Sequence, residues 1–370
     1  MPIFLYALMV CSLLWTENFE DTKDGLQKEV LFFLMPFVFL GIGPLEHRQV
    51  ERIFKIFSFS MMLYAVFYIQ RAVFNFLATG ETRFFFYHDL VSMDLSAIYM
   101  SVFASFGMFY FISREQKSKL DQTCTVVLAL FIVLLSSKVL IIVNVILFVC
   151  YYIYRSKTSS SVKRFTLLTS IGFFIFSFLF IPKIQERFLH EYETAFVDNT
   201  VNMEIGDAEH MIYNLSLSQA WNDQQFESNN FLPGTALRVF QIRIFTEMLT
   251  EHDIFFTGFG FDASQERIRE KVKQYNLFYG NGEFNFHNQY VQTFAEIGIF
   301  GLLILLGMIC YSLKKAFTTK DFMYIVFSLT MIILFLTDSF LSRQRGIIFF
   351  LTLYCIFTTK SGIEGQRKQL

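Results

Sequence analysis

The sequence predicts an all-α polytopic membrane protein of about ten transmembrane helices, with one large, partly helical loop on the outer side. The first observation is composition, because 54% of the 370 residues are hydrophobic and only 17% are charged, whereas a soluble domain carries about 25% charge. The second is the recurrence of apolar runs along the chain. The third is a single long polar connection that interrupts these runs.

The apolar runs give the candidate spans, since a helix needs about 20 mostly apolar residues to cross a hydrocarbon layer of roughly 30 Å. Residues 2–15 are taken as a span rather than a signal peptide, because Met1-Pro2-Ile3 lacks a basic start and Trp15-Thr16-Glu17 lacks a small-residue cleavage site. The expected spans are 2–15, 29–43, 54–70, 90–112, 122–137, 139–154, 165–181, 296–313, 322–337 and 346–358.

The orientation in the membrane follows from Lys and Arg, because these residues are more frequent in the short loops on the cytoplasmic side. One set of alternating loops, with the C-terminal tail, holds 16 basic residues and the other set holds 7. Both termini are therefore predicted inside. The chain then divides into seven N-terminal helices in 1–181, an outer loop in 182–295, and three helices with a tail in 296–370.

The outer loop differs in composition from the rest of the chain. It has 16 acidic against 8 basic residues and four of the six histidines. We expect a helix over 183–195, a variable or partly mobile insertion over 198–230, and a turn at Thr257–Asp262 followed by a short charged helix. Leu237, Phe240, Ile244 and Met248 follow helical spacing, which predicts an amphipathic helix at the membrane interface.

Charge and cysteine usage exclude other classes. A net charge of −1 does not indicate the basic face of a nucleic-acid binder. The five cysteines lie inside apolar runs without a C-x-x-C spacing, as small buried hydrophobic residues do. No carboxylate cluster suggests a metal, and no cofactor is expected.

The most specific motif is the string HNQYVQTFAEIGIFGLLILL, which begins at His287 and contains Glu296-Ile297-Gly298. Three further motifs lie upstream of this string. Arg238 opens a helix that leads to Gly258-Phe259-Gly260, and Leu135-Ser136-Ser137-Lys138 and His88-Asp89-Leu90 precede it. Together these motifs resemble those of the O-antigen ligase and polymerase family. These motifs span residues 85–310 in family order. Lys138 departs from the arginine usual there, and 198–230 matches no motif.

The resemblance implies inverting, metal-independent transfer of a glycan from a polyprenyl pyrophosphate donor to an acceptor hydroxyl, at the outer face of a bacterial inner membrane. Histidine suits a base for a sugar hydroxyl, so His287 is the candidate catalytic residue. Arginine binds phosphate oxygens in pairs, so Arg238 is the first candidate for pyrophosphate, with Lys138 and Arg243 after it. Asn288, Tyr290, His88 and Glu296 are supporting candidates. If Arg238, Lys138 and His287 form one site, they should converge on a cavity open to lipid.

Each candidate has a structural alternative. Arg243 lies about 140° around the helix from Arg238, which predicts a solvated or headgroup position. The position of Lys138 is explained equally well by a side chain that reaches the outer membrane–water interface. The position of His88 is explained equally well by a structural hydrogen bond. Glu296 is expected to fix helix packing. Arg343 and Arg345 are expected to anchor an interface.

Several alternatives stay open at this stage. A transporter or flippase of lipid-linked glycans would share the spans but should show internal repeats, which the two halves lack. A membrane scaffold or sensor would need no His/Arg set. The sequence does not separate a ligase from a polymerase, and it leaves open whether the acceptor is a lipid A core, a growing lipid-linked glycan or a protein.

Overall fold

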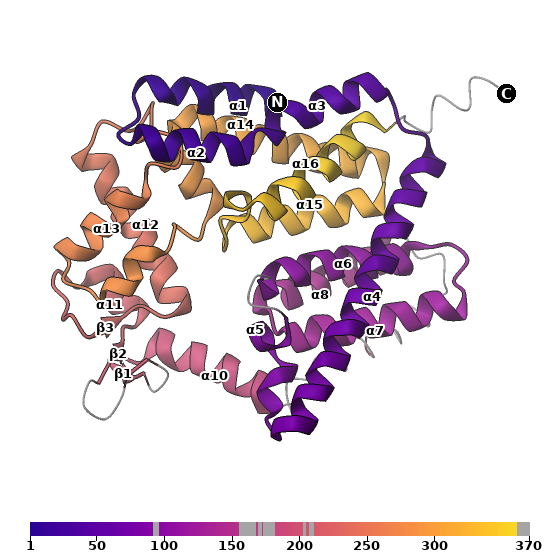
Figure 1. The fold of residues 1–370 in the computed structure, drawn as a ribbon, viewed down its shortest axis with the longest axis horizontal. Coiled ribbons are helices and arrows are strands. Elements are labelled where there is room, and N and C mark those ends of the chain that lie inside the picture. The colour runs from indigo at the N-terminus through magenta and orange to yellow at the C-terminus, as the bar shows by residue number, and fades with distance from the viewer. Residues whose placement is uncertain are drawn as a thin grey trace. The chain divides into compact units, whose positions relative to one another are not determined.

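The chain was analysed in a computed structural model, which describes residues 1–91, 96–154, 182–202, 205–206 and 211–360, with residues 168 and 172 singly. Helices dominate the described residues (Figure 1). The chain forms two compact units, and each draws on several chain segments. Unit 1 comprises Met1–Pro36, Glu186–Met308 and Phe335–Leu351, and unit 2 comprises Phe37–Gln185, Ile309–Leu334 and Thr352–Leu370.

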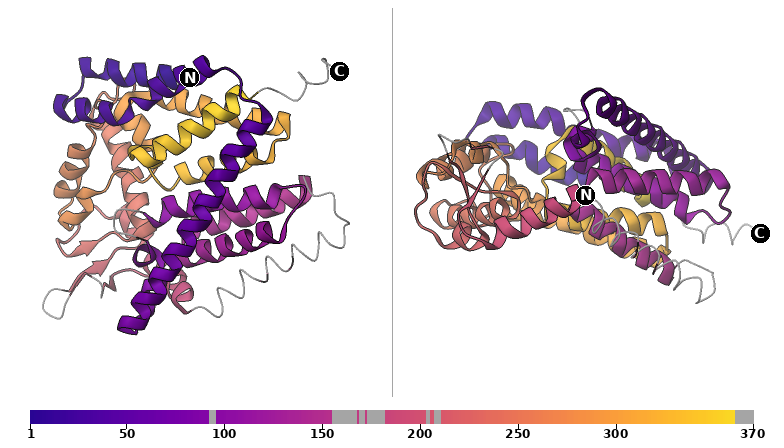
Figure 2. Two further views of the ribbon diagram at one scale, coloured as in Figure 1. Left: turned by 45° about the vertical axis from the view of Figure 1, so that its right-hand side comes forward. Right: turned by 90° about the horizontal axis from the view of Figure 1, so that it is seen from below.

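Unit 2 is a group of apolar helices with well-defined ends. Its long helix α4 begins after a capping box between Glu46 and Gln49 and ends at Gly80, which has the left-handed conformation common at helix C-termini. Ser118 and Asp121 form a second capping box that starts α7. Both views of Figure 2 keep α6 and α7 side by side. The elements are α4 (His47–Thr79), η2 (Thr82–Phe85), α5 (Tyr87–Leu90), α6 (Ala97–Ser113), α7 (Lys119–Leu135), α8 (Lys138–Tyr154) and α15 (Phe322–Phe335).

Unit 1 contains most of the predicted outer loop together with the N-terminal segment of the chain. Its small sheet pairs β1 with β2 antiparallel and β2 with β3 parallel. The N-terminal elements are α1 (Pro2–Cys11), η1 (Ser12–Leu14), α2 (Phe19–Glu29) and the start of α3 (Leu31–Ile42). The loop elements are α10 (Pro182–Phe196), β1 (Thr200–Val201), β2 (Tyr213–Asn214), α11 (Leu217–Asn222), β3 (Asn230–Phe231), α12 (Gly234–Glu251), α13 (Gln265–Gln274) and η3 (Tyr279–Glu283). The remaining elements are α14 (Gln289–Thr319), η4 (Phe340–Ser342) and α16 (Gln344–Thr359), and α14 and α16 each continue into unit 2.

The N-terminal helical pair holds the turn at 257–262. Trp15 Nε1 donates to the carbonyl of Thr257 at 2.9 Å, and the amide of Glu17 donates to the carbonyl of Phe259 at 3.0 Å. Ser12 and Thr22 hydroxyls bind the amide and the carbonyl of Phe261 at 3.0 and 2.7 Å. Residues about 240 positions apart are thereby fixed together within unit 1.

The membrane character predicted from composition agrees with the helices. Three stretches among the described residues are long and apolar enough to cross a membrane, namely Phe19–Ile42, His47–Thr79 and Gln289–Thr319. Five shorter apolar helices accompany them: Pro2–Leu14, Ala97–Ser113, Lys138–Tyr152, Phe322–Phe335 and Gln344–Thr359. The expected span at 165–181 lies outside the described residues apart from 168 and 172, so the count of ten spans and their orientation stay predictions.

The helix α12 packs differently from the expectation of an interfacial helix. Its apolar face, from Leu237 to Met248, is buried against Phe226, Tyr275 and Phe286 in one hydrophobic cluster of unit 1. The expected helices at 183–195 and after Asp262 are present as α10 and α13. Within the expected insertion, the described residues form the small sheet and α11, which cover the same cluster through Leu215, Ala220 and Phe226.

Candidate active site

The string His-Asn-Gln-Tyr forms the start of α14, and Asn288 makes that start. The Asn288 Oδ1 accepts hydrogen bonds from the amides of Tyr290 and Val291 at 3.0 and 3.1 Å, which is the usual role of an N-cap. His287 has a left-handed backbone with φ of 44°, and its amide donates to Asn285 Oδ1 at 3.1 Å. The imidazole is therefore placed by a fixed turn, immediately before the helix. The Tyr290 ring packs edge-on against Phe335.

The loop between α15 and α16 is held by three hydrogen bonds, two to the start of α14 and one to α12. Asn288 Nδ2 donates to the carbonyl of Leu336 at 3.2 Å. Gln289 Oε1 accepts from the amide of Leu341 at 2.7 Å, at a fully buried position. Arg238 Nε, from α12, donates to the carbonyl of Thr337 at 2.9 Å. Residues 336–341 are thus held against both α12 and α14, and they carry Asp338 and lead to Arg343.

These contacts gather two arginines, one histidine and one carboxyl into a cluster of unit 1. Burial lowers the pKa of His287 to about 4, and the positive charges of Arg238 and Arg343 add to the effect. Burial raises the pKa of Asp338 to about 6, against the lowering effect of the same two arginines. At neutral pH the imidazole is therefore uncharged and the carboxyl is ionised. We call His287, Arg238, Arg343 and Asp338 the α14 cluster.

The α14 cluster has the chemistry of an anion site beside a proton acceptor. Arg238 uses Nε for Thr337 and Nη1 for the carbonyl of Gly234 at 3.1 Å. Its Nη2 group makes no hydrogen bond within the part of the chain that the structure describes. A neutral imidazole can accept a proton, and guanidinium groups pair with phosphate oxygens. The combination suits a reaction in which a hydroxyl loses its proton and a phosphate group leaves.

The Glu-x-Gly and Gly-x-Gly motifs pack against each other, backbone to backbone. The helix α14 breaks at Ile297 and Gly298, where Gly298 has φ of 68° and ψ of −171°. The amides of Phe259 and Gly260 donate to the carbonyls of Ala295 and Glu296 at 2.8 and 3.0 Å. A side chain on Gly258 would lie 2.6 Å from the amide nitrogen of Ile297. Glycine is required because only it allows this approach and this φ. Glu296 takes part in this contact through its backbone carbonyl, and the expected packing role of its side chain stays a prediction.

Arg243 is buried in a separate network, so the expectation of a solvated position is wrong. Its side chain is 7% exposed and lies 3.0 Å from Glu247 Oε1. Its Nη1 group donates to the carbonyls of Ala220 and Asp223 at 3.3 and 2.7 Å, and Nη2 donates to the Tyr275 hydroxyl at 3.1 Å. These partners attach α11 to α12, and they occupy the donors that a phosphate would need.

Two sequence candidates belong to unit 2. Lys138 opens α8 directly after Ser136, which ends α7 in the left-handed conformation with φ of 51°. His88 lies in α5, with its ring against that of Tyr87. Their convergence with His287 therefore stays a prediction. Among the described residues no group of His, Cys, Asp and Glu is arranged to hold a metal ion.

Comparison with known families adds an independent finding. Residues 123–306, about half of the chain, match a family model described as O-antigen ligase. The chain belongs to the O-antigen ligase family. Membership confirms the resemblance on which the sequence prediction rested, and it implies a membrane glycosyltransferase-like enzyme. No curated protein matches the chain.

The O-antigen ligase match includes Lys138, Arg238, His287 and the two glycine motifs, but it ends before Asp338 and Arg343. Sequence reasoning assigned Arg343 to an interface and overlooked Asp338. The available signal was the string Asp338-Ser339-Phe340-Leu341-Ser342-Arg343, in which two opposite charges follow an apolar run. Ionisable residues at the end of a span are functional candidates by default.

Proposed function

We propose that this member of the O-antigen ligase family transfers a glycan from a polyprenyl pyrophosphate donor to an acceptor hydroxyl at the outer face of a bacterial inner membrane. The observation that supports it best is the α14 cluster, in which His287 and Arg238 meet Arg343 and Asp338. The reaction is metal-independent and inverting in this proposal. It acts as a ligase or a polymerase in surface polysaccharide synthesis.

The proposed step is a single displacement at the anomeric carbon. The acceptor oxygen forms a bond to that carbon on the face opposite the pyrophosphate, and its proton passes to His287. The bond between the anomeric carbon and the pyrophosphate oxygen breaks, and the polyprenyl pyrophosphate leaves with the electron pair. Arg238 and Arg343 stabilise the charge that develops on the leaving group. Because attack and departure are on opposite faces, the configuration inverts.

Donor binding itself improves the base in this scheme. Burial and, after it, the two positive charges of Arg238 and Arg343 hold the pKa of His287 at about 4. A bound pyrophosphate offsets these charges, so the pKa of His287 rises above this value, although burial still lowers it, and the imidazole becomes a stronger proton acceptor. Asp338 is ionised at neutral pH and balances part of the arginine charge. Asp338 is also the second group of the cluster that can accept a proton.

The test is glycan analysis in a deletion strain complemented with variants. His287→Ala should abolish long-chain surface glycan while membrane insertion stays intact, and normal glycan would refute the catalytic assignment. His190→Ala is the matched control, because His190 is exposed on α10 in the same loop. Arg238→Lys should give a partial loss, since lysine supplies charge without paired donors.

The deletion strain also separates the finer alternatives. A polymerase deletion leaves single repeat units on the surface anchor, whereas a ligase deletion leaves polymer on the polyprenyl carrier. If His287→Ala instead prevents the donor from reaching the outer leaflet, the flippase alternative gains support and the transferase proposal fails.

A further inference from the structure

Three large aromatic side chains are exposed next to each other where the connection between α12 and α13 packs on α14. Phe255 and Phe256, in the connection, are 45% and 59% exposed, and Phe300 on α14 is 52% exposed. The ring centroids of Phe255 and Phe256 lie 5.0 Å apart, and those of Phe256 and Phe300 lie 6.0 Å apart. We call these three side chains of unit 1 the aromatic patch.

The connection is fixed to the point at which α14 breaks. The break at Gly298 removes hydrogen bonds of the helix. The amide of Ile299, which in a continuous helix would donate to Ala295, donates to the carbonyl of Phe255 at 2.9 Å. The carbonyl of Ala295 accepts from the amide of Phe259 at 2.8 Å. The connection thus supplies backbone partners that the break removes, as non-helical backbone requires at membrane depth.

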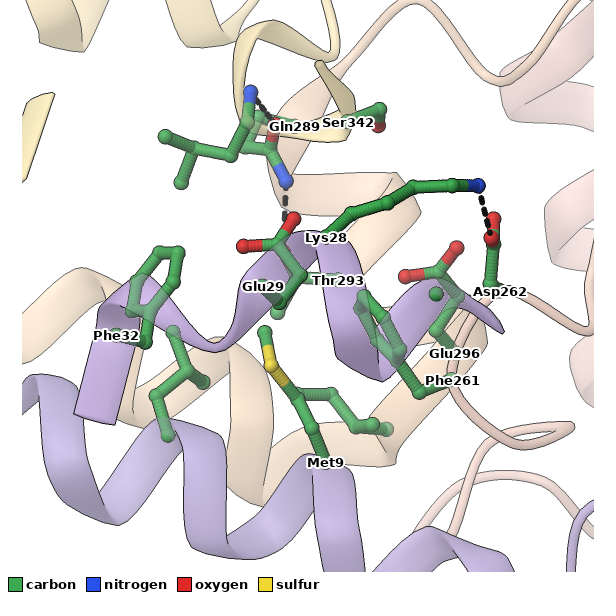
Figure 3. A pocket seen from close by; sticks show the side chains of 14 residues that line it. Met9, Lys28, Glu29, Phe32, Phe261, Asp262, Gln289, Thr293, Glu296 and Ser342 are labelled. Atoms are coloured by element: carbon green, nitrogen blue, oxygen red, sulfur yellow. Dashed lines mark hydrogen bonds and ion pairs between the residues drawn. The ribbon is translucent and has the colours of Figure 1, made fainter. Parts of the chain in front are cut away.

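The break also separates a polar face of α14 from an apolar one. Before the break, Gln289, Thr293 and Glu296 are buried and line a cavity of about 30 Å³ together with residues of α2 (Figure 3). After the break, Phe300 and Leu303 are 52% and 56% exposed. Polar side chains of a membrane-spanning helix face the protein interior. The exposed apolar face is therefore the one that remains for lipid.

The length of α14 sets the depth of the aromatic patch in a bilayer. From Ile297 to Leu313 the helix has 17 residues without a charge, and the exposed Lys314 follows. Such a stretch rises about 25 Å, whereas the hydrocarbon layer is roughly 30 Å thick. With Lys314 at one boundary, the break lies about 5 Å inside the opposite one. A Lys314 side chain that extends along the helix to reach the boundary moves the break out to the opposite boundary itself.

Charged residues limit the depth from the other side. Glu251 ends α12 and Asp253 follows it, and both are exposed. Asp253 is two residues before Phe255, and its carboxylate requires headgroups or water. The aromatic patch therefore reaches only the outermost part of the hydrocarbon layer.

We propose that the aromatic patch is a lipid-contact surface, which inserts Phe255 and Phe256 among the acyl chains of the leaflet on the side of the large loop. Acyl chains are the occupant because the patch continues the exposed apolar face of α14 and lies at the depth where that helix enters the bilayer. The membrane contact expected for α12 belongs instead to the connection that follows it. This inference goes beyond the proposed function and does not depend on it.

The contact has a consequence for the α14 cluster. Gly298 is nine residues after Gln289, so the start of α14 lies at most about 14 Å from the break along the helix. A patch anchored in the acyl chains therefore holds His287 near the headgroup layer.

The test is tryptophan fluorescence of the full-length protein in phosphatidylcholine liposomes. Phe256→Trp adds one tryptophan to Trp15 and Trp221, and the wild-type protein gives the baseline. The added fluorescence should be lost when the lipid is brominated in the upper part of its acyl chains, and it should resist acrylamide in the water. Quenching by acrylamide without quenching by brominated lipid would overturn the proposal.

Two control variants calibrate the measurement. Lys273→Trp, at an exposed position of the charged helix α13, should be quenched by acrylamide and not by brominated lipid. Leu303→Trp, deeper on α14, should be quenched more strongly when the bromine lies farther down the acyl chain. Phe256→Trp should resemble Leu303→Trp in its resistance to acrylamide, and behaviour like that of Lys273→Trp would refute the contact.

Coverage of the patch by protein gives a different result. Protection of Phe256→Trp from both quenchers would show that another part of the chain or a second copy covers the patch, and it would refute the lipid contact. Phe300→Trp repeats the measurement from α14 if gel filtration shows that Phe256→Trp is misfolded, and the same outcomes apply to it. The assay contains neither donor nor acceptor, so its failure is distinguishable from failure of the transferase proposal.

Discussion

Replacement of Gly298 by alanine tests the backbone junction that supports α14. The residue has φ of 68° and ψ of −171°, a region that side chains other than glycine enter at a cost of about 1–3 kcal/mol. An added Cβ would lie 2.7 Å from the amide nitrogen of Thr257 and closer still to the carbonyl of Phe256. Both are backbone atoms, so the two segments must separate.

Separation removes hydrogen bonds that cross the junction. The amide of Ile299 donates to the carbonyl of Phe255 at 2.9 Å, and that of Phe259 donates to Ala295 at 2.8 Å. Each bond contributes about 1 kcal/mol. With the strain included, Gly298→Ala should destabilise the protein by about 4 kcal/mol.

The assay is thermal unfolding of the detergent-solubilised protein, followed by fluorescence-detected gel filtration. We expect the Tm of Gly298→Ala to fall by about 5 °C or more. Gly307→Ala is the matched control on the same helix, because a Cβ there meets only the Met1 side chain at 3.8 Å and alanine favours helix by about 1 kcal/mol. A Gly298→Ala protein that melts with the control would refute the reasoning.

Three further predictions concern the charged groups. Arg243→Met should lower stability by about 3–5 kcal/mol, because it breaks a buried pair, whereas Arg269→Met on an exposed pair should cost about 0–1 kcal/mol; equal melting of the two would contradict the network. The kcat/KM for transfer should fall as pH drops below about 6, where Asp338 takes up a proton. In Asp338→Asn the pH at which kcat/KM falls should move toward about 4, the pKa of His287. An unchanged pH profile in this variant would exclude Asp338 as the group that sets it. Arg343→Gln should raise the pKa of His287 and weaken donor binding, measured by the pH profile and KM, and an unchanged KM would place Arg343 outside the site.

The sequence predicts local features of the site well where helix geometry or a motif carries the signal. The angle between Arg238 and Arg243 around the helix predicted that the two side chains do not face the same site. In the structure they bind different partners. The string that begins at His287 was singled out from the sequence, and in the structure its Asn288 caps the start of α14. The turn at 257–262 and the helix after it were expected from glycine and charge.

Long-range contacts were beyond the same reasoning. Asp338 lies about fifty residues after His287, and only the hydrogen bonds of Asn288 and Gln289 show that the two segments meet. The apolar face of α12 looked suited to the membrane interface, because the sequence cannot show that Phe226 and Tyr275 cover it. Arg243 was misplaced for the same reason, since its partners come from α11 and α13–η3 segments.

The attachment of the 336–341 loop to Asn288, Gln289 and Arg238 has a consequence for synthesis of the chain. The ribosome completes α12 and the start of α14 well before it reaches Asp338 and Arg343. The α14 cluster is therefore incomplete until α15 has been made and its far end has returned to the N-terminus of α14. Premature termination within α15 would leave His287 and Arg238 in a chain without two of the four cluster residues. Under the proposed function, such a partly made chain should not process donor.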